Sequence, residues 1–482
     1  MKKSNYTSFE ILVLALEAAI QKWNNEIEMT RIRHVTVIDI GKTNAKLALV
    51  EMDSLSEIAV RKMANTVVQD SPYPHFNVDA LWSFIVDGLA AHQRDHGVDA
   101  ISVTTHGACA ALMDSAGNLA LPVLDYEYAG YGEAATHYAR KRPSFAETGS
   151  PHLPLGLNLG AQIFWQQKSF PEAFAQVSQI LMYPQYWGYR LTGVASNEVT
   201  SLGCHTDLWS PTANDYSSVV DKMGWRKLMA PLWPATKPLG LITPEVAQAT
   251  GISPQTPVAC GIHDSNASLV PHLLVHSKPF SVVSTGTWVI SMAIGGKPTA
   301  LDERRDTLMN VNAFAEAVPS ARFMGGREFQ VVMGNDRPTI THADVAAVLG
   351  KGIFLLPSIV QGSGPYADRV ANWIGSPSPA ERQVASSFYL GLMTATCLDL
   401  IGAEGETIVE GPFASNTNFL DILEIATGRP AVTSQNATTG TTIGAALLVA
   451  PEKMIKTPVK RREIANPPAL TAYVNRWREL LG

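Results

Sequence analysis

Short apolar runs that end at polar, glycine-containing turns are the main pattern of this chain. In residues 34–50, an apolar run is followed by the polar turn 41–43 and then by a second, largely apolar run. This pattern predicts two strands joined by a tight turn. Residues 280–292 repeat it around the turn 285–287. Two similar hairpins, one in each half of the chain, indicate a duplicated α/β fold.

The stretch 256–267 predicts a buried strand that leads into a helix. Residues 257–260 are apolar, Gly261 ends the run, and Asp264 stands where the helix would begin. An Asp at a helix start is most often an N-cap. Here it stands near a Thr-Gly-Thr turn, which exposes backbone N–H groups and hydroxyls to an anion. A carboxylate beside a phosphate-binding turn indicates phosphoryl transfer.

The first turn imitates a known phosphate-binding motif without matching it. Gly41, Lys42 and Thr43 look like the end of a Walker A loop, but its first glycine would fall on Thr36. The pattern also predicts a strand, not a helix, after the turn. Each hairpin taken alone is explained by an ordinary β-turn. The presence of both hairpins together with Asp264 favours phosphate binding between the two halves.

Two further strand ends carry polar side chains. The strand 100–105 ends on His106 and Gly107, and the strand 121–124 ends at Asp125 and Glu127. Ligands of α/β folds bind at such strand ends. Taken alone, His106 is better explained as a turn residue with a satisfied ring. The two carboxylates either bind sugar hydroxyls or face solvent, and both interpretations stay open.

The other elements fit an α/β chain of two halves without a low-complexity linker. Periodicity predicts helices over 7–28, 78–94, 161–192 (in two pieces), 243–250, 379–400, 418–426 and 440–449, and strands over 352–356, 407–409 and 431–432. We expect a helical extension over 1–33, a first domain over 34–255, and a second domain over 256–482 that opens with the strand before Asp264.

Composition excludes several classes of protein. The 482 residues are 46% hydrophobic and 17% charged, as in soluble enzymes. The net charge of −6 argues against non-specific nucleic-acid binding. The four cysteines are far apart and form no CxxC motif, so neither a zinc site nor a disulfide framework is indicated. Apolar runs are too short to span a membrane, and Glu17 interrupts the best signal-peptide core. We therefore expect a cytoplasmic protein.

The stretch 231–264 closely resembles the FGGY family of carbohydrate kinases. Further matches are Asp39, Gly41, Thr43 and Lys46 at the front, and the stretches 189–193, 284–287 and 440–445. The resemblance covers nearly everything after residue 33. It implies two actin-like, ribonuclease-H-type domains around a cleft that binds ATP and Mg²⁺ on one side and a sugar at the bottom. The short polar first turn is similar to that of the L-rhamnulose and L-fuculose kinases.

The resemblance also implies roles for individual residues. Asp264 would be the catalytic base, and Asp39 and Asp264 would lie at the metal. The implied nucleotide-binding residues are Gly41, Lys42, Thr43, Asn44, Lys46, Thr285, Gly286, Thr287, Gly411, Pro412 and Asn416. The implied substrate-binding residues are His106, Gly107, Asp125, Glu127 and Asp264.

Three departures from the family pattern leave the substrate open. Lys42 stands where many members have Thr, and Glu410-Gly411-Pro412-Phe413 replaces the usual double glycine. Asp125-Tyr126-Glu127 stands where many members have Trp-x-Asp-x-Arg, at the sugar. The leading hypothesis is an ATP-dependent kinase of a ketose such as L-rhamnulose, L-fuculose or xylulose. The alternatives are a non-catalytic actin-like sugar sensor and a phosphotransferase that acts on a non-sugar; a homodimer is left open.

Overall fold

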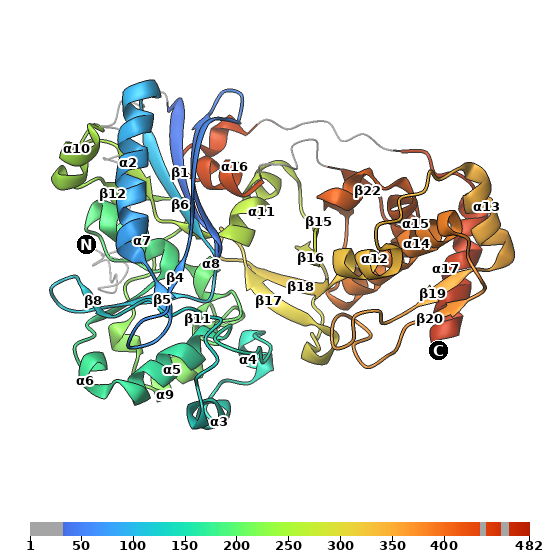
Figure 1. Ribbon diagram of the computed structural model, residues 1–482, viewed down its shortest axis with the longest axis horizontal. Helices are drawn as coiled ribbons and strands as arrows, with labels where there is room; N and C mark the ends of the chain where they lie inside the picture. Colours follow the sequence, from blue (N-terminus) through green and yellow to red (C-terminus); the bar gives the residue numbers. More distant parts are fainter. Residues whose placement is uncertain (1–31, 434–439, 455–461) are drawn as a thin grey trace, which may run out of the picture.

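The structure is a computed structural model that describes residues 32–433, 440–454 and 462–482. The helix expected over 7–28, and with it nearly all of the extension 1–33, lies outside the described residues. Figure 1 shows the N-terminal half on the left and the helices α14, α15 and α17 of the C-terminal half on the right, with α11 and the strands β15–β18 between them. Among the described helices, none is long and apolar enough to cross a membrane.

The first sheet has the order β12-β13-β6-β1-β2-β3, with β14 also paired to β6. Its strands are β1 (His34–Ile40), β2 (Asn44–Glu51), β3 (Ser56–Ala64), β6 (Ala100–Thr105), β12 (Pro238–Leu241), β13 (Pro257–Ala259) and β14 (Ile262–His263). β1 is antiparallel to β2 and parallel to β6. The strand that we expected to open the second domain is therefore part of the first sheet, because β13 pairs with β12 and β6.

Helices cover both faces of this sheet, which explains why β1 reads as an almost continuous apolar run. α2 (Val78–His96) packs Leu81, Ile85 and Leu89 against one face. α11 (Asp264–Val275) and α16 (Gly440–Leu447) share a core with Val35 and Val37 on the other face. α16 thus lies beside β1 and β6 although it comes from the end of the chain (Figure 1).

α11 and α16 approach each other closely because small residues line their contact. A Cβ atom at Gly444 would overlap the backbone of Ala267. The small residues of 440–449 thus pack as the sequence predicts. Helix α16 ends at Leu447, two residues earlier than expected.

The second sheet has the order β17-β18-β16-β15-β21-β22. Its strands are β15 (Phe280–Thr285), β16 (Val289–Ile294), β17 (Thr307–Val311), β18 (Ala317–Phe323), β21 (Glu406–Glu410) and β22 (Ala431–Thr433). β15 is antiparallel to β16 and parallel to β21, as β1 is to β2 and β6. The repeated hairpin and crossover confirm the duplicated α/β fold. α14 (Pro379–Leu400), α15 (Thr417–Thr427) and α17 (Pro467–Leu481) form a core with the second sheet.

A smaller sheet, β8-β7-β9, lies below the first one in Figure 1. It consists of β7 (Ala110–Met113), β8 (Leu119–Leu121) and β9 (Gln179–Met182), and packs with α5 (Leu159–Ser169). Two expectations were wrong here. The segment 179–182 is a strand rather than helix, because its apolar side chains pair with β7 before α7 (Tyr183–Thr192) begins. The strand expected over 121–124 ends at Leu121.

The remaining described elements are short or lie at the periphery. They are β4 (Val67–Val68), β5 (His75–Phe76), α3 (Glu133–Ala139), α4 (Phe145–Thr148), α6 (Pro171–Phe174), α8 (Val199–Leu202), β10 (Trp209–Ser210), β11 (Asp215–Tyr216), α9 (Ser218–Lys222), η1 (Arg226–Leu228), α10 (Pro244–Thr250), η2 (Glu303–Arg305), α12 (Gly325–Met333), α13 (His342–Lys351), β19 (Phe354–Leu356), β20 (Asn372–Ile374), η3 (Pro412–Ser415) and η4 (Pro451–Lys453).

Candidate active site

Asp264 is the first residue of α11 and follows directly from β14. Its Oδ1 atom accepts hydrogen bonds from the backbone N–H of Ser265 at 2.6 Å and from the Ser265 hydroxyl at 3.3 Å. The imidazole Nε2 of His263 lies 3.2 Å from the same oxygen. The side chain is 34% exposed, so the carboxylate is both anchored and accessible. Oδ2 has no hydrogen bond from the part of the chain that the structure describes, and is free to take a proton.

Asp39, near the end of β1, lies within electrostatic range of Asp264. Burial raises the pKa of the Asp39 carboxyl, the Lys46 ammonium opposes this, and the negative charge of Asp264 raises it further. Lys46 Nζ lies 3.6 Å from Asp39 Oδ2 and 3.2 Å from Glu57 Oε1. Two carboxylates that repel each other at the edge of a cavity match the way Mg²⁺ binds, through one or two carboxylates and the phosphates of a substrate. The donor set therefore fits the predicted metal.

A cavity of about 440 Å³ joins the two halves at this point. Lys46 Nζ donates a hydrogen bond of 2.6 Å across it to Thr442 Oγ1 of α16. The lining residues are Asp39, Lys46, Asp264, Ser265, Ser268, Ser284, Thr285, Glu410, Gly411, Gly440, Thr441 and Thr442. Carboxylates, an ammonium group and hydroxyls around one polar cavity suit a metal-bound phosphate chain.

The two predicted phosphate-binding turns differ in the contacts that their side chains make. In the first turn, Gly41 N donates to Asn44 O at 2.9 Å, and Thr43 and Asn44 are exposed at the tip. In the second turn, the Thr285 hydroxyl donates to the backbone carbonyl of Glu410 and accepts from Phe413 N at 3.1 Å. Thr285 therefore joins its turn to the loop after β21 through its hydroxyl, a role that the sequence did not indicate.

Gly411 is needed for this close approach. Its φ of +79° is a conformation that L side chains rarely adopt, and a Cβ atom there would overlap the carbonyl oxygen of Thr285. A single glycine, Gly411, thus lets the loop 410–413 pack against the second hairpin, where the usual family pattern has two glycines.

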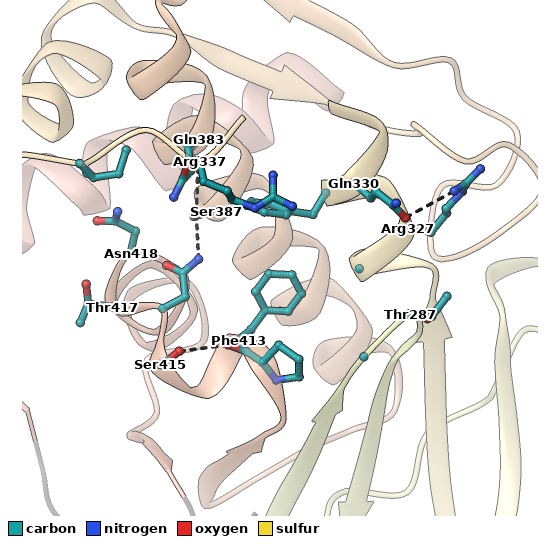
Figure 2. A pocket seen from close by; sticks show the side chains of 16 residues that line it. Thr287, Arg327, Gln330, Arg337, Gln383, Ser387, Phe413, Ser415, Thr417 and Asn418 are labelled. Atoms are coloured by element: carbon teal, nitrogen blue, oxygen red, sulfur yellow. Dashed lines mark hydrogen bonds between the residues drawn. The ribbon is translucent and has the colours of Figure 1, made fainter. Parts of the chain in front are cut away.

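A second cavity, of about 750 Å³, adjoins the same loop in the C-terminal half. Figure 2 shows Arg327 and Gln330 of α12 on one side of it and Ser415 and Thr417 on the other. The full lining is Gly286, Thr287, Gly326, Arg327, Phe329, Gln330, Arg337, Ile340, Gln383, Ser387, Pro412, Phe413, Ser415, Asn416, Thr417 and Asn418. Two aromatic rings with amide, hydroxyl and guanidinium groups can hold a planar heterocycle and a ribose.

Sequence reasoning found only part of this second cavity. Gly286, Thr287, Pro412 and Asn416 were predicted, and all four line it. Asn416 caps α15, and its Nδ2 donates to Ser387 Oγ at 2.9 Å. Arg327, Gln330 and Arg337 were missed, because they stand in no recognisable motif and reach the cavity only through the placement of α12 and of the loop that follows it.

The predicted substrate-binding residues His106, Asp125 and Glu127 lie close together around Tyr126 and Lys42. The buried His106 ring lies between Phe76, Tyr126 and Tyr183, with centroid distances of 5.2, 5.4 and 5.3 Å. Its Nδ1 lies 2.8 Å from the Gly107 carbonyl, and its buried Nε2 has no partner among the described residues. Burial lowers the pKa of His106, so the ring is neutral. Nδ1 must then donate to the carbonyl, which leaves Nε2 as an unused acceptor.

Lys42 belongs to this side rather than to the phosphate cavity. Its ammonium group forms ion pairs with Asp125 and, at 3.2 Å, with Glu127 Oε2. The Asp125 side chain is 8% exposed and that of Glu127 59%. The Lys42 ammonium thus bridges the two carboxylates, whereas the sequence predicted that Lys42 would bind the nucleotide.

A buried cluster behind Asp264 was also missed. Cys204 Sγ lies 3.4 Å from His263 Nε2, and Gly107 is so close to that ring that a Cβ atom would come within 2.9 Å of Nε2. Although burial favours a neutral thiol, His205 and His263 lower the pKa of Cys204. Burial likewise opposes a charged imidazole, yet Cys204 and Asp264 raise the pKa of His263. These residues fix the orientation of the ring that faces Asp264.

Comparisons with known proteins identify the family of both halves of the chain. The sequence model of the FGGY family of carbohydrate kinases, N-terminal domain, matches residues 34–271, and that of the carbohydrate kinase FGGY C-terminal domain matches residues 277–457. A carbohydrate kinase from Novosphingobium aromaticivorans is 35% identical, with a TM-score of 0.87, over 93% of this chain and 100% of that one.

More distant relatives share the fold or part of the sequence. An L-fuculokinase from Salmonella typhi is 24% identical over 273 residues, which are 55% of this chain and 57% of that protein. The matched region thus spans little more than half of the relative's length. A xylulose kinase from Lactobacillus acidophilus, at 15% identity, superposes with a TM-score of 0.72 over 93% of this chain and 97% of that one.

Proposed function

Because the chain belongs to the FGGY family of carbohydrate kinases, we propose that it transfers the γ-phosphoryl group of ATP to a hydroxyl of a ketose. The acceptor would be of the class of L-fuculose, L-rhamnulose or xylulose. The observation that carries the proposal is the position of Asp264. Its carboxylate lines the polar cavity, and the adjacent His263 touches Gly107 on the side of His106.

Asp264 would act as the general base. Ser265 and His263 hold Oδ1, so Oδ2 takes the proton of the acceptor hydroxyl as its oxygen forms a bond to the γ-phosphorus. The bond from the γ-phosphorus to the bridging oxygen breaks, and ADP leaves with that electron pair. Such reactions depend mainly on positioning and on stabilisation of charge.

Asp39 and Asp264 would hold Mg²⁺ at the cavity that joins the halves, and the bound ion would supply positive charge against the β- and γ-phosphates. Lys46 would compensate the rest of the negative charge there, since it already lies beside Asp39. The second cavity would take the adenosine, because the loop 410–413 connects it to the first.

The acceptor would lie against His106, Asp125 and Glu127. The Nε2 atom of His106 is an acceptor without a partner among the described residues, and because it is buried, a hydroxyl would reach it only with a shift of the side chains around it. Carboxylates accept hydrogen bonds from adjacent hydroxyls, and charged acceptors form the stronger bonds. The partly exposed ring of Tyr126 offers an apolar surface to the carbon face of a sugar, while the buried rings of Phe76 and Tyr183 support His106.

A coupled assay of ADP release tests the proposal. The purified protein with ATP and Mg²⁺ is screened against ketoses, polyols, sugar acids and non-sugar alcohols and amines. We expect turnover with at least one ketose and none in the Asp264→Asn variant. ADP release only with a non-sugar acceptor would overturn the sugar kinase. Sugar binding in calorimetry without any turnover would identify a sensor instead.

A further inference from the structure

Lys42 stands at the tip of the β1–β2 hairpin, beside residues expected to contact phosphate. Its ammonium group, however, does not lie with these residues. Lys46, four residues later, lines the cavity that joins the halves, while Lys42 is absent from the lining of both cavities described above. The Lys42 ammonium lies instead between Asp125 and Glu127. The two lysines of this hairpin thus lie in different parts of the site, Lys46 at the cavity and Lys42 beside Asp125 and Glu127.

The surroundings of Lys42 are those of the acceptor side. Its Nζ lies 5.2 Å from the centroid of the Phe76 ring and 5.0 Å from that of Tyr126, the two rings that also pack on His106. The charges of both Lys42 and Asp264 act on the pKa of His106, so both groups lie within electrostatic range of its ring. The side chain is only 18% exposed, which holds the ammonium in place.

We infer that Lys42 is a specificity-determining residue of the acceptor site, where it binds an oxygen of a neutral polyhydroxylated substrate. This inference rests on the proposed kinase function. An ammonium group has three N–H donors, and the two carboxylates take two of them. The third can donate to a hydroxyl or carbonyl oxygen, while the carboxylates accept from neighbouring hydroxyls.

The charge balance also selects the class of substrate. The single positive charge of Lys42 already faces the negative charges of Asp125 and Glu127, and Asp264 adds another nearby. A substrate that carries a carboxylate would meet a net negative site, and like-charge contacts are unfavourable. A ketose or polyol meets no such penalty. The geometry therefore favours neutral sugars over sugar acids.

The test compares Lys42→Met and Lys42→Arg with the wild type and with Lys227→Met, a control at an exposed lysine on η1. Steady-state kinetics are measured with ATP and with the ketose found by the ADP-release screen. For Lys42→Met we expect KM for the ketose to rise at least ~10-fold, the loss expected when a hydrogen bond to a charged group is removed, while KM for ATP stays within ~2-fold. Lys42→Arg should recover part of the loss.

The outcomes separate this inference from the proposed function. A raised KM for ATP with an unchanged KM for the ketose would show that Lys42 acts on the phosphates of ATP, and would overturn the inference. Unchanged values for both substrates would also overturn it, as would a wild type that phosphorylates a sugar acid better than the matching polyol. A wild type that phosphorylates no sugar at all would overturn the proposed function, and the inference with it.

Discussion

The Nε2 atom of His263 lies 3.2 Å from Oδ1 of Asp264 and 3.4 Å from Sγ of Cys204, a residue 59 positions earlier in the chain. Cys204 thus holds the ring at the atom that faces the carboxylate, and the Asn266 amide lies 3.3 Å from the other ring nitrogen, Nδ1. Because Ser265 binds the same oxygen, the free Oδ2 is directed away from these partners. The orientation of the base thus depends on a buried neighbour that does not line the cavity.

Removal of this support should slow the chemical step. In His263→Ala we expect kcat to fall by up to ~100-fold, since a small misplacement of a catalytic group can have this effect. KM for ATP should stay near that of the wild type. His263→Gln keeps a side-chain donor and should restore part of kcat. Equal losses in both variants, with normal thermal stability, would argue against a positioning role.

Asp264→Asn should abolish turnover and leave ATP binding intact. The amide cannot take the proton of the attacking hydroxyl, and a general base contributes typically ~10²–10⁴-fold. Steady-state kinetics measure the loss, and calorimetry with ATP checks that the site is preserved. A variant with nearly the wild-type kcat would show that another group is the base.

Asp39 should control the response to Mg²⁺. We expect excess EDTA to stop the reaction, because the metal neutralises phosphate charge. Asp39→Asn removes one of two predicted ligands and should raise the Mg²⁺ concentration for half-maximal rate, by ~10-fold or more if metal affinity falls as for other ligand losses. The exposed Asp70→Asn serves as the control. A rate that does not depend on Mg²⁺ would exclude the metal site.

Glu127→Gln should raise KM for the sugar and leave KM for ATP nearly unchanged. The variant loses a charged acceptor and one partner of Lys42. A lost bond to a charged group costs roughly 1.5–3 kcal/mol, which is ~10- to 100-fold in KM. Because the side chain is 59% exposed, the lower end of that range is expected. Glu133→Gln, on the exposed start of α3, is the matched control. If Glu127→Gln behaves like this control, His106 and Asp125 become the better candidates.

Because of His92, we expect the free energy of unfolding to fall as the pH becomes acidic. Burial against β1 lowers the pKa of this imidazole to about 4, and its Nδ1 lies 3.2 Å from Thr36 Oγ1. In the unfolded chain the pKa is about 6.5. As the pH falls from about 6.5 to about 4, the unfolded chain binds a proton that the folded chain does not, so the free energy of unfolding falls. The loss attributable to His92 reaches at most roughly 3 kcal/mol.

Urea unfolding at pH 7 and pH 5 measures this effect. His92→Gln keeps a polar side chain that does not titrate, so its free energy of unfolding should change less between the two pH values. An identical change in both proteins would show that other groups cause the acid sensitivity.

The sequence by itself determined the elements that depend on neighbours along the chain. Alternating and continuous apolar runs specify strands and helices through local periodicity, and the turns 41–43 and 285–287 follow from glycine and polar residues. The hairpins, the position of Asp264 at the start of α11 and the duplicated α/β fold were therefore predictable. The roles expected for Asp39, His106 and Asp125 came from the family resemblance and remain predictions.

Only the tertiary structure decided where side chains go once the elements pack. Lys42 and Lys46 stand on one hairpin, but Lys42 pairs with Asp125, 83 positions away, and Lys46 binds Thr442, 396 positions away. The strand 257–259 joined the first sheet because its partners are β6 and β12, and Arg327 and Gln330 reached the second cavity with α12. Long-range packing sets such contacts, and no local pattern records which of two nearby lysines turns toward Asp125 and which toward Thr442.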